Sequence, residues 1–416
     1  MSVASRSSDI PIQGEASYAP DEGRFRTKTG WWQPNAALAA DFYNARYARN
    51  GVDLTLGDAL ATVRSSAHFL AGPDGVYQSF ATNTLARITA VGAYIGRQVT
   101  NKCTNYNANP ASTAGVTKYG TGSVLSIVDD QAALAAAGLQ NIATSGKVYK
   151  LDNSAGASEG GVMFSGSAGN VNKHTASVYM RTVGGTACVA INSSIASAFD
   201  TYAAYSRVAV TGTPVDTGRG AQIKVAAGGT AYFILNQLEE NTFTTPPIAT
   251  AGAAATRYAS DVQAASMGWF NAAGLASGGA ALIVPNYASV GHGVSRTLFE
   301  LSDGTANNLV RAHVDASDKP ALVIVAGGVT QIDTALSAAV ALGRKPLAFG
   351  WGAGGGYVVD RTGNVASFGA ITLPGGLSVL RLGSSVAGNY LNAKLEQIHI
   401  CGTIQQTDGQ TWAVTA

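Results

Sequence analysis

The sequence predicts a mainly β protein, with two antiparallel β-sandwich modules of the jelly-roll kind behind an extended, partly helical N-terminal segment. Three observations lead to this prediction. Glycine supplies 50 of the 416 residues, which suits a chain with many tight turns. Charged residues make up 12%, about half of the roughly 25% that is usual in globular domains. From residue 64 onward, short stretches of strand character alternate with turn residues.

The composition also excludes several classes of protein. A hydrophobic content of 46% with a net charge of +2 is the opposite of the pattern of disordered chains. The same net charge gives no electrostatic case for nucleic-acid binding. We find neither the apolar core of a signal peptide nor a run of roughly 20 apolar residues. We therefore expect a protein that is made in the cytoplasm without membrane insertion.

The cysteines are few and widely spaced in the sequence. Cys103, Cys188 and Cys401 have neither CxxC spacing nor an even count, so they imply no disulfide framework and no zinc site. We expect three free, buried thiols, because unpaired cysteine is among the most buried residue types.

The first 30 residues are polar and carry no strand or helix period, as expected of an arm that becomes ordered against a partner. The arm ends in Trp31-Trp32. These rings are expected to be buried, either against their own chain or against a docking partner, since Trp is favoured at interface centres. The arm is thus a candidate docking segment.

A helix is predicted next, over residues 35–49. Asn35 can cap it, its apolar residues share one face, and Asn50-Gly51 supplies a left-handed stop. A second short helix is compatible with residues 56–63. These helices account for the partly helical character of the segment.

A β-hairpin is predicted around Pro73-Asp74-Gly75, with residues 66–70 and 75–80 as its strands. Proline fixes one φ angle and glycine allows a positive one, which makes this tripeptide a turn signal. Further on, the Ala and Leu content of residues 129–142 predicts a helix, with Asp129 or Asp130 as its cap.

Two runs of short strands follow, and their 8–15-residue spacing without intervening helices favours antiparallel sandwiches. In the first run, strands are expected at 147–151, 161–164, 174–181, 187–191, 205–210, 222–225 and 231–238. In the second run, they are expected at 280–284, 296–301, 308–314, 321–325, 345–351, 356–359, 378–382 and 394–401. A short closing helix is expected at 408–414.

The stretch 244–260 contains Pro246-Pro247 and little side-chain bulk, which is typical of a linker. The expected organisation is an arm and helix over 1–60, a hairpin connector over 61–110, a first sandwich over 111–248, a linker over 249–262 and a second sandwich over 263–416.

Four stretches resemble one family, the modular fibre, tail and head-spike proteins of tailed bacteriophages and phage-like gene transfer agents. Residues 61–88 (ATVRSSAHFLAGPDGVYQSFATNTLARI) resemble the opening hairpin of such proteins, and residues 93–105 (AYIGRQVTNKCTN) resemble its continuation, in which a short strand leads to Thr-Asn. Residues 235–262 (LNQLEENTFTTPPIATAGAAATRYASDV) resemble the exit from a carbohydrate-binding-module-like jelly roll. Residues 344–400 resemble the C-terminal half of a concanavalin A-like, or laminin-G-like, sandwich. Residues 1–30 match no part of the family.

This resemblance implies a virion protein that attaches a particle to host cell-surface polysaccharide. It further implies that residues 1–60 dock onto other virion proteins, and that the chain forms a homo-oligomer. The low charge and the small-residue surface fit such an oligomer, with a trimer expected for a fibre or a pentamer at a capsid vertex. Several linked weak sites would then gain avidity. A purely structural spike base or decoration protein and a glycan depolymerase are the alternatives.

No catalytic constellation is evident, so we expect a protein that is not an enzyme. The five histidines are dispersed without metal-ligand spacing. The acidic pairs Asp129-Asp130 and Glu239-Glu240 are adjacent, and adjacent strand residues point to opposite faces. No cofactor is expected. The loop 301–308 could offer oxygen ligands to calcium, but a polar hairpin turn accounts for it better.

Sugar binding needs aromatic faces for stacking and polar groups for hydroxyls. The candidates in the second sandwich are Trp269, Tyr287, Trp351, Tyr357 and Tyr390, with Asp303, Asn307 and Asn389 as polar partners. In the first sandwich they are Tyr179, Tyr202 and Tyr205. The alternative for each ring is a place in the core, since aromatic residues dominate sandwich packing.

Overall fold

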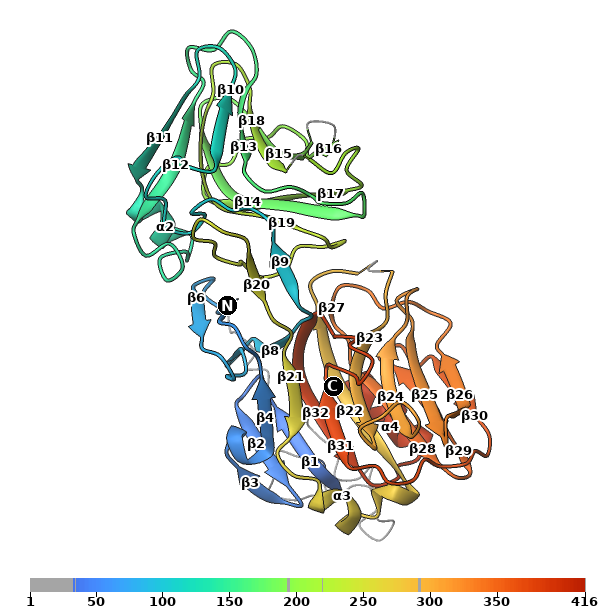
Figure 1. Cartoon of the computed structure of the whole chain (residues 1–416). Coiled ribbons are helices and arrows are strands. Elements are labelled where there is room, and N and C mark those ends of the chain that lie inside the picture. Colours follow the sequence, from blue (N-terminus) through green and yellow to red (C-terminus); the bar gives the residue numbers. More distant parts are fainter. Residues whose placement is uncertain (1–32, 34, 193–194, 219, 291–292, 416) are drawn as a thin grey trace. The chain divides into compact units, whose positions relative to one another are not determined.

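The computed structural model describes residues 33, 35–192, 195–218, 220–290 and 293–415. All its strand pairs are antiparallel, and the chain forms two compact units (Figure 1). Unit 1 contains the described residues up to Arg64 together with Asn83–Arg97 and 259–415, and unit 2 contains Ser65–Thr82 and Gln98–Tyr258. The mainly β prediction is confirmed. The boundaries expected from the sequence were consecutive, whereas unit 1 is assembled from three separate stretches of chain.

The larger sheet of unit 1 has eleven strands. Its main path runs β3 (Val52–Leu54), β2 (Arg46–Arg49), β1 (Ala36–Asp41), β32 (Ala393–Cys401), β22 (Gly278–Tyr287), β28 (Leu347–Gly352), β29 (Gly355–Asp360) and β30 (Val365–Phe368). Beside this path, β27 (Gly343–Arg344) pairs with β22, β8 (Gly92–Ile95) with β32, and β7 (Arg87–Ile88) with β8. Figure 1 shows β1, in blue, next to β32, in red, so the two ends of the described chain meet in one sheet.

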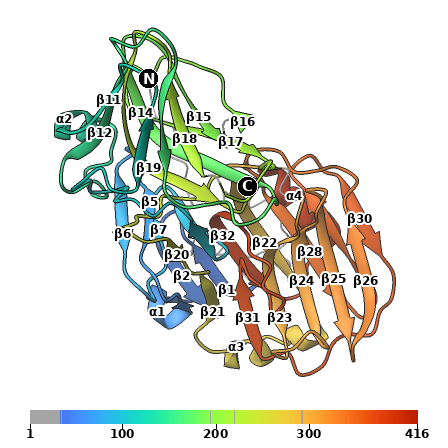
Figure 2. The same ribbon diagram turned by 45° about the horizontal axis from the view of Figure 1, so that its top comes forward.

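The second sheet of unit 1 has seven strands. Its order is β26 (Val329–Ala335), β25 (Pro320–Ala326), β24 (Leu309–Val314), β23 (Arg296–Ser302), β31 (Val379–Leu382), β21 (Asp261–Ala264) and β4 (Leu60–Val63). In Figure 2 its strands β25 and β26 run alongside β28 and β30 of the larger sheet. Alternate residues such as Phe299 and Leu301 of β23, together with Phe349 and Ile398 of the larger sheet, fill the core between the two sheets.

Four helical segments complete unit 1. They are α1 (Leu56–Ala59), α3 (Gly268–Ala272), the 3-10 turn η3 (Leu275–Ser277) and α4 (Gln406–Thr415). The closing helix expected at 408–414 is confirmed as α4. Its Trp412 and Ala413 pack with Leu282 and Val359 on the outer face of the eleven-stranded sheet, so that sheet is buried on both sides over this area.

The helix predicted over residues 35–49 is wrong, because these residues form β1 and β2. All six residues of β1 are buried, since the strand lies between β2 and β32 and both its faces are covered. Alanine favours helices in isolation, but tertiary burial overrides that preference. Asn50 and Gly51 do take positive φ angles, of 49° and 77°, yet they turn the β2–β3 hairpin and end no helix.

Unit 2 contains two five-stranded sheets. One is β10 (Val116–Tyr119), β13 (Gly160–Phe164), β18 (Ala221–Val225), β15 (Ala187–Ile191) and β16 (Ile195–Ala196). The other is β11 (Val124–Asp129), β12 (Lys147–Asp152), β19 (Thr230–Glu239), β14 (His174–Val183) and β17 (Ser206–Gly212). Each of the strands expected between residues 147 and 238 is present, with ends shifted by at most two residues.

The local predictions in unit 2 have mixed outcomes. The hairpin around Pro73-Asp74-Gly75 is confirmed as β5 (His68–Ala71) and β6 (Tyr77–Phe80). The expected helix at 129–142 is shorter, α2 (Gln131–Ala136). The Asp130 carboxylate makes no cap hydrogen bond and instead accepts from Arg181 Nε at 2.8 Å and Tyr205 Oη at 2.7 Å.

The stretch expected to be a linker is packed within unit 2. Its β20 (Ala255–Arg257) pairs with β9 (Val99–Asn101). Thr245 and Thr250 are buried, and the Thr250 hydroxyl donates to the Asn105 carbonyl at 2.6 Å. Thus residues up to Tyr258 belong to the compact part of unit 2.

Two further expectations concern the whole chain. Cys103, Cys188 and Cys401 are free and buried, as expected. In the residues that the structure describes, none of the helices combines the length and the apolar character that a membrane span requires.

Candidate functional site

The aromatic residues expected to contact sugar in the second sandwich are mostly in the core. Trp269, Tyr287, Trp351 and Tyr357 are each 5% exposed or less. The first three pack between the sheets of unit 1, and Tyr357 packs under α4. Their ring faces therefore contact protein, as the core alternative predicted.

The tyrosines of unit 2 are similarly occupied. Tyr179 and Tyr205 are buried, and Tyr202 packs partly against the core of the unit. The Tyr179 hydroxyl lies 2.6 Å from that of Tyr77, and the Arg207 guanidinium lies over the Tyr179 ring, 5.7 Å from its centroid. These three rings do not form an open aromatic platform.

Asp303 and Asn307 lie in the turn between β23 and β24. The Asp303 carboxylate accepts hydrogen bonds from Thr305 N at 2.7 Å, Thr305 Oγ1 at 2.6 Å and Asn308 Nδ2 at 2.9 Å. Both carboxylate oxygens thus hold the turn together, which favours the polar-turn interpretation over a calcium loop. Within the described ranges, no three His, Cys, Asp or Glu side chains are grouped closely enough to hold a metal ion.

Asn389 and Tyr390 lie in the loop 383–392, and both are partly buried. This loop contacts the outer face of the seven-stranded sheet, because Val386 N donates to Glu300 Oε1 at 2.9 Å and Ser384 Oγ donates to Asp261 Oδ1 at 3.1 Å. Tyr390 therefore lies beside a set of charged side chains on β21, β23, β24 and β31.

Those charges form a row across the sheet. Arg381, Glu300 and Arg311 are neighbours in register, and both arginines lie 3.8 Å from the Glu300 carboxylate. Glu300 is fully buried, and this burial raises the pKa of its carboxyl, against the opposing effect of the Val386 amide and the two arginines. The row is an internally paired network that fixes the loop 383–392, and it leaves little free surface for a ligand.

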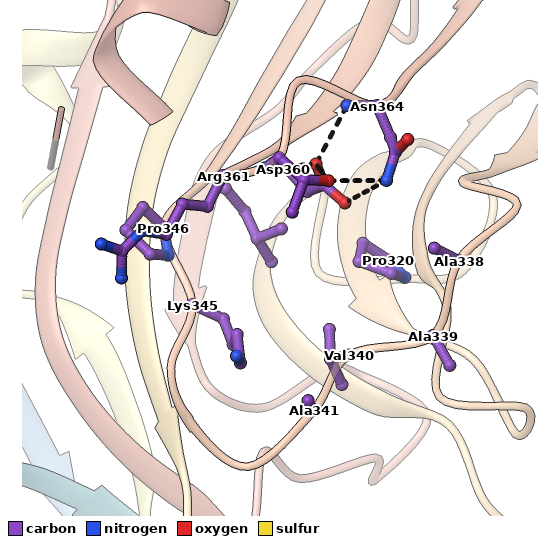
Figure 3. Close-up of a pocket in the computed structure, with 12 residues that line it drawn as sticks. Pro320, Ala338, Ala339, Val340, Ala341, Lys345, Pro346, Asp360, Arg361 and Asn364 are labelled. Atoms are coloured by element: carbon purple, nitrogen blue, oxygen red, sulfur yellow. Dashed lines mark hydrogen bonds between the residues drawn. The ribbon is translucent and has the colours of Figure 1, made fainter. Parts of the chain in front are cut away.

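An open pocket lies instead at one end of the unit 1 sandwich (Figure 3), with a volume of about 240 Å³. Pro320 begins β25 of the seven-stranded sheet, whereas Leu347 and Asp360 belong to β28 and β29 of the other sheet. The segment 336–342, here called the crossover loop, links the two sheets and supplies a third wall. The lining residues are Pro320, Ala338, Ala339, Val340, Ala341, Lys345, Pro346, Leu347, Asp360, Arg361, Thr362 and Asn364.

The Asp360 turn forms one wall of the pocket. Asp360 Oδ1 accepts from Thr362 N at 2.8 Å, Thr362 Oγ1 at 2.7 Å and Asn364 N at 3.0 Å, while Oδ2 accepts from Asn364 Nδ2 at 2.9 Å. Asn364 Nδ2 also donates to Thr362 Oγ1 at 2.7 Å. The carboxylate thus fixes the turn and holds Thr362 and Asn364 at the pocket rim.

The opposite wall is apolar and is formed by the crossover loop around Val340. A buried ion pair beneath this loop fixes its position. Val340 N donates to the Asp318 carbonyl at 2.7 Å, and the Asp318 carboxylate pairs with the buried guanidinium of Arg296. That guanidinium lies over the Tyr287 ring, 4.9 Å from its centroid. Tyr287, expected to contact a ligand, instead contributes to the support of the pocket wall.

The chemistry of the pocket combines methyl and ring carbons with hydrogen-bonding groups. Figure 3 shows Lys345 and Pro346 on one side and Ala338 and Pro320 on the other. None of the residues proposed from the sequence as sugar ligands lines it. The pattern Asp-x-Thr-Gly-Asn at 360–364, which parallels Asp-Gly-Thr at 303–305, was the signal that could have drawn attention to this turn. Trp31 and Trp32 lie outside the described residues.

No family model matches the sequence, and no curated protein matches it. Among solved structures, the CBM40 of Ruminococcus gnavus IT-sialidase bound to α2,3-sialyllactose is 14% identical, with a TM-score of 0.29, over 34% of this chain and 83% of that one. Domain 4 of AbnA, a GH43 arabinanase from Geobacillus stearothermophilus in complex with arabinotriose, is 15% identical, with a TM-score of 0.29, over 37% and 73%.

A leech intramolecular trans-sialidase is 10% identical, with a TM-score of 0.31, over 36% of this chain and 25% of its own length. Each of these similarities covers about a third of this chain. At these TM-scores the similarity identifies neither a ligand nor a binding residue, so any assignment depends on the geometry of the site itself.

Proposed function

We propose that this protein is a fibre or spike component of a phage-like particle and that it binds a glycan of the host surface through the pocket at the end of unit 1. The observation that carries the binding proposal is the pocket itself. It is open, it lies between the ends of two sheets, and its walls combine apolar carbons with amide, hydroxyl and cationic groups. The virion role is supported by the sequence resemblance of residues 61–88, 93–105, 235–262 and 344–400.

The dimensions of the pocket favour one sugar residue. Its volume of about 240 Å³ lies below the roughly 300–1,000 Å³ of pockets that take drug-sized ligands. Ala338, Ala339 and Val340 offer accessible apolar surface for the C–H face of a pyranose, and Thr362 and Asn364 offer polar atoms for hydroxyls. Because no aromatic ring lines the pocket, we expect weak binding at each site and a need for several linked copies.

A homo-oligomer, a trimer or a pentamer, would supply these copies. Docking onto the particle was expected through residues 1–60. Since residues 36–63 supply strands and a helix of unit 1, we narrow the proposed docking segment to the residues before Ala36, which include Trp31 and Trp32.

We propose binding rather than hydrolysis. Most glycosidases act through a pair of carboxyl groups on either side of the bond that is cleaved. Asp360 is the one carboxylate among the residues that line the pocket, and its oxygens already accept hydrogen bonds from Thr362 and Asn364. Incubation with a bound polysaccharide should therefore leave the polymer length unchanged, and a fall in length would contradict this part of the proposal.

A purely structural virion component is the second candidate. The burial of Trp269, Tyr287, Trp351 and Tyr357 favours it, because those rings stabilise the sandwich and present no aromatic face to solvent. A structural spacer would bind no glycan, so a binding experiment separates the two candidates.

The experiment is a glycan array, with host capsule and lipopolysaccharide fragments, probed with the full chain and two variants. Ala339→Leu adds an aliphatic side chain at the pocket, and Ala306→Leu is the matched control in the exposed turn between β23 and β24. We expect binding by the wild type and the control, and at least about tenfold weaker binding by Ala339→Leu, the equivalent of about 1.4 kcal/mol. If none of the three proteins binds a glycan, the structural role is favoured. Equal binding by all three would place the binding site elsewhere.

A further inference from the structure

Two cationic side chains flank the pocket at the end of unit 1. Lys345 and Arg361 line it, together with one carboxylate, that of Asp360. Neither cation forms an ion pair with a described carboxylate, in contrast to Arg344, whose Nε lies 2.8 Å from Glu396 Oε2. Two positive charges and one negative charge leave the lining with a net charge of +1.

The unused hydrogen-bonding capacity of the pocket is mainly donor capacity. An ammonium group has three N–H donors and a guanidinium has five. Neither the Lys345 nor the Arg361 side chain donates a hydrogen bond to another residue in the described part of the chain. The Asp360 oxygens, by contrast, already accept from Thr362 and Asn364. Thr362 Oγ1 is used as well, because it donates to Asp360 and accepts from Asn364. A complementary ligand must therefore supply acceptors and negative charge.

We propose that the sugar unit bound in this pocket carries a carboxylate, as in an acidic capsular polysaccharide. This inference rests on the proposed function and adds the chemical class of the glycan. Arginine and lysine bind carboxylates through charge-assisted hydrogen bonds, which are about twice as strong as neutral ones. The apolar wall formed by Ala338, Ala339 and Val340 takes the ring carbons, while Lys345 and Arg361 take the carboxylate at the rim.

The absence of an aromatic ring among the lining residues makes the charge more important. Without a stacking contact, the electrostatic contribution is a large share of the binding free energy. Because Arg361 is exposed and Lys345 is half-buried, salt screens this contribution, with a Debye length of about 8 Å at physiological ionic strength. Binding should therefore weaken as salt concentration rises, which a neutral sugar in an apolar pocket would not show.

The test uses the full chain and immobilised polymers of defined chemistry. The probes are a polyuronate, the same polymer after reduction of its carboxyl groups to alcohols, and a sulfated neutral polysaccharide. The double variant Lys345→Gln/Arg361→Gln removes the two pocket charges. The double variant Lys118→Gln/Lys147→Gln removes two exposed charges of unit 2 and serves as the matched control. Far-UV circular dichroism confirms that both variants are folded.

We expect the wild type and the control to bind the polyuronate, and binding to the reduced polymer to be about tenfold weaker or more. The pocket variant should lose binding to a similar extent.

Binding to the sulfated polymer alone would overturn the assignment of a carboxylate. Equal binding to the polyuronate and its reduced form would overturn the charge inference while leaving the glycan-binding proposal intact. Unchanged binding by the pocket variant would also overturn it, and no binding to any glycan would overturn both proposals.

Discussion

Among the described residues, buried charged side chains are more numerous in unit 1, and buried amide side chains are more numerous in unit 2. In unit 1, Arg296 pairs with Asp318, and Glu300 lies between Arg311 and Arg381. In unit 2, by contrast, Asn105 and Asn236 exchange side-chain hydrogen bonds of 3.0 and 2.7 Å.

The amide network of unit 2 extends to the backbone. Asn101 Nδ2 and Asn107 Nδ2 both donate to the Asn236 carbonyl, at 3.1 and 2.9 Å. A buried carboxylate, Glu239, belongs to the same region and accepts from Thr245 Oγ1 at 2.8 Å. Most of the donors and acceptors in this network are nonetheless neutral.

This difference has consequences for stability. Removing the partner of a buried charge costs more free energy of unfolding than removing the partner of a buried amide. Charged groups also titrate, whereas amides do not. Trp269, Trp351 and Trp412 lie in unit 1, and the sequence of unit 2 contains no tryptophan. With Trp31 and Trp32 replaced by Phe, tryptophan emission reports unit 1 alone, and the comparison becomes measurable within one chain.

Asp318→Asn should have the largest effect. Asp318 adopts a φ of 63°, which asparagine tolerates, so the change removes the charge and keeps the shape. Leaving Arg296 buried without its partner should cost about 3–5 kcal/mol of unit 1 stability. Denaturant unfolding followed by tryptophan emission measures this cost. Asp303→Asn, in the exposed turn, is the control, and an equal loss in both variants would contradict the importance of the buried pair.

The next largest effect concerns pH. Burial lowers the pKa of His399 and of His313 to about 4, whereas histidine in an unfolded chain titrates near 6.5. Between these values the unfolded chain binds more protons, so unit 1 loses stability as pH falls from about 6.5 to 4. Each histidine contributes up to about 3 kcal/mol.

His399→Gln isolates this contribution. The raised pKa values of Glu300 and Asp41 act in the opposite direction, because a carboxyl that protonates more readily in the folded state stabilises it in acid. The comparison is therefore the wild-type slope of stability against pH minus that of the variant. Identical slopes between pH 4 and 6.5 would contradict the assignment to His399.

Asn105→Ala should have a smaller effect, confined to unit 2. It leaves the buried side chain of Asn236 without its partner, at a cost of about 1–3 kcal/mol. Because no charge is involved, the loss should be the same at pH 5 and pH 8. Thermal unfolding followed by circular dichroism of the whole chain should shift, while tryptophan emission, which reports unit 1, should not. A strong dependence of the loss on pH would remove the distinction drawn between the two units.

Glu240→Gln should have the smallest effect. Hydrogen bonds from Asn172 and Asn170, together with Lys102, lower the pKa of Glu240 to about 2. The stabilisation is present above about pH 4.5 and is lost as pH falls towards 2. Since the side chain is 41% exposed, solvent screening keeps it below about 1 kcal/mol. A larger loss would show that charged groups matter as much in unit 2 as in unit 1.

Strands bounded by local turns could be predicted from the sequence. The strands between residues 147 and 238 pair within the same stretch of chain, and their turn residues mark their ends. The strand β1 could not, because its partner β32 lies more than 350 residues away and its alanine-rich sequence has a helical period. The pairing that makes residues 36–41 a strand is absent from the local sequence.

The candidate site was harder to predict than the fold. Sequence reasoning selected rings such as Trp351 by residue type, but burial, which decides whether a ring is available, depends on tertiary structure. The pocket is lined instead by alanines and prolines and by the Asp360 turn. These residues carry no distinctive chemistry until two sheets place them together.

The most direct test of glycan binding is a crystal structure of the full chain with an acidic oligosaccharide bound. We predict electron density for one sugar ring between Val340 and Pro346, with its carboxylate within hydrogen-bonding distance of Lys345 or Arg361. Density for the sugar elsewhere, for example beside Tyr390 or on unit 2, with the pocket empty, would contradict the account.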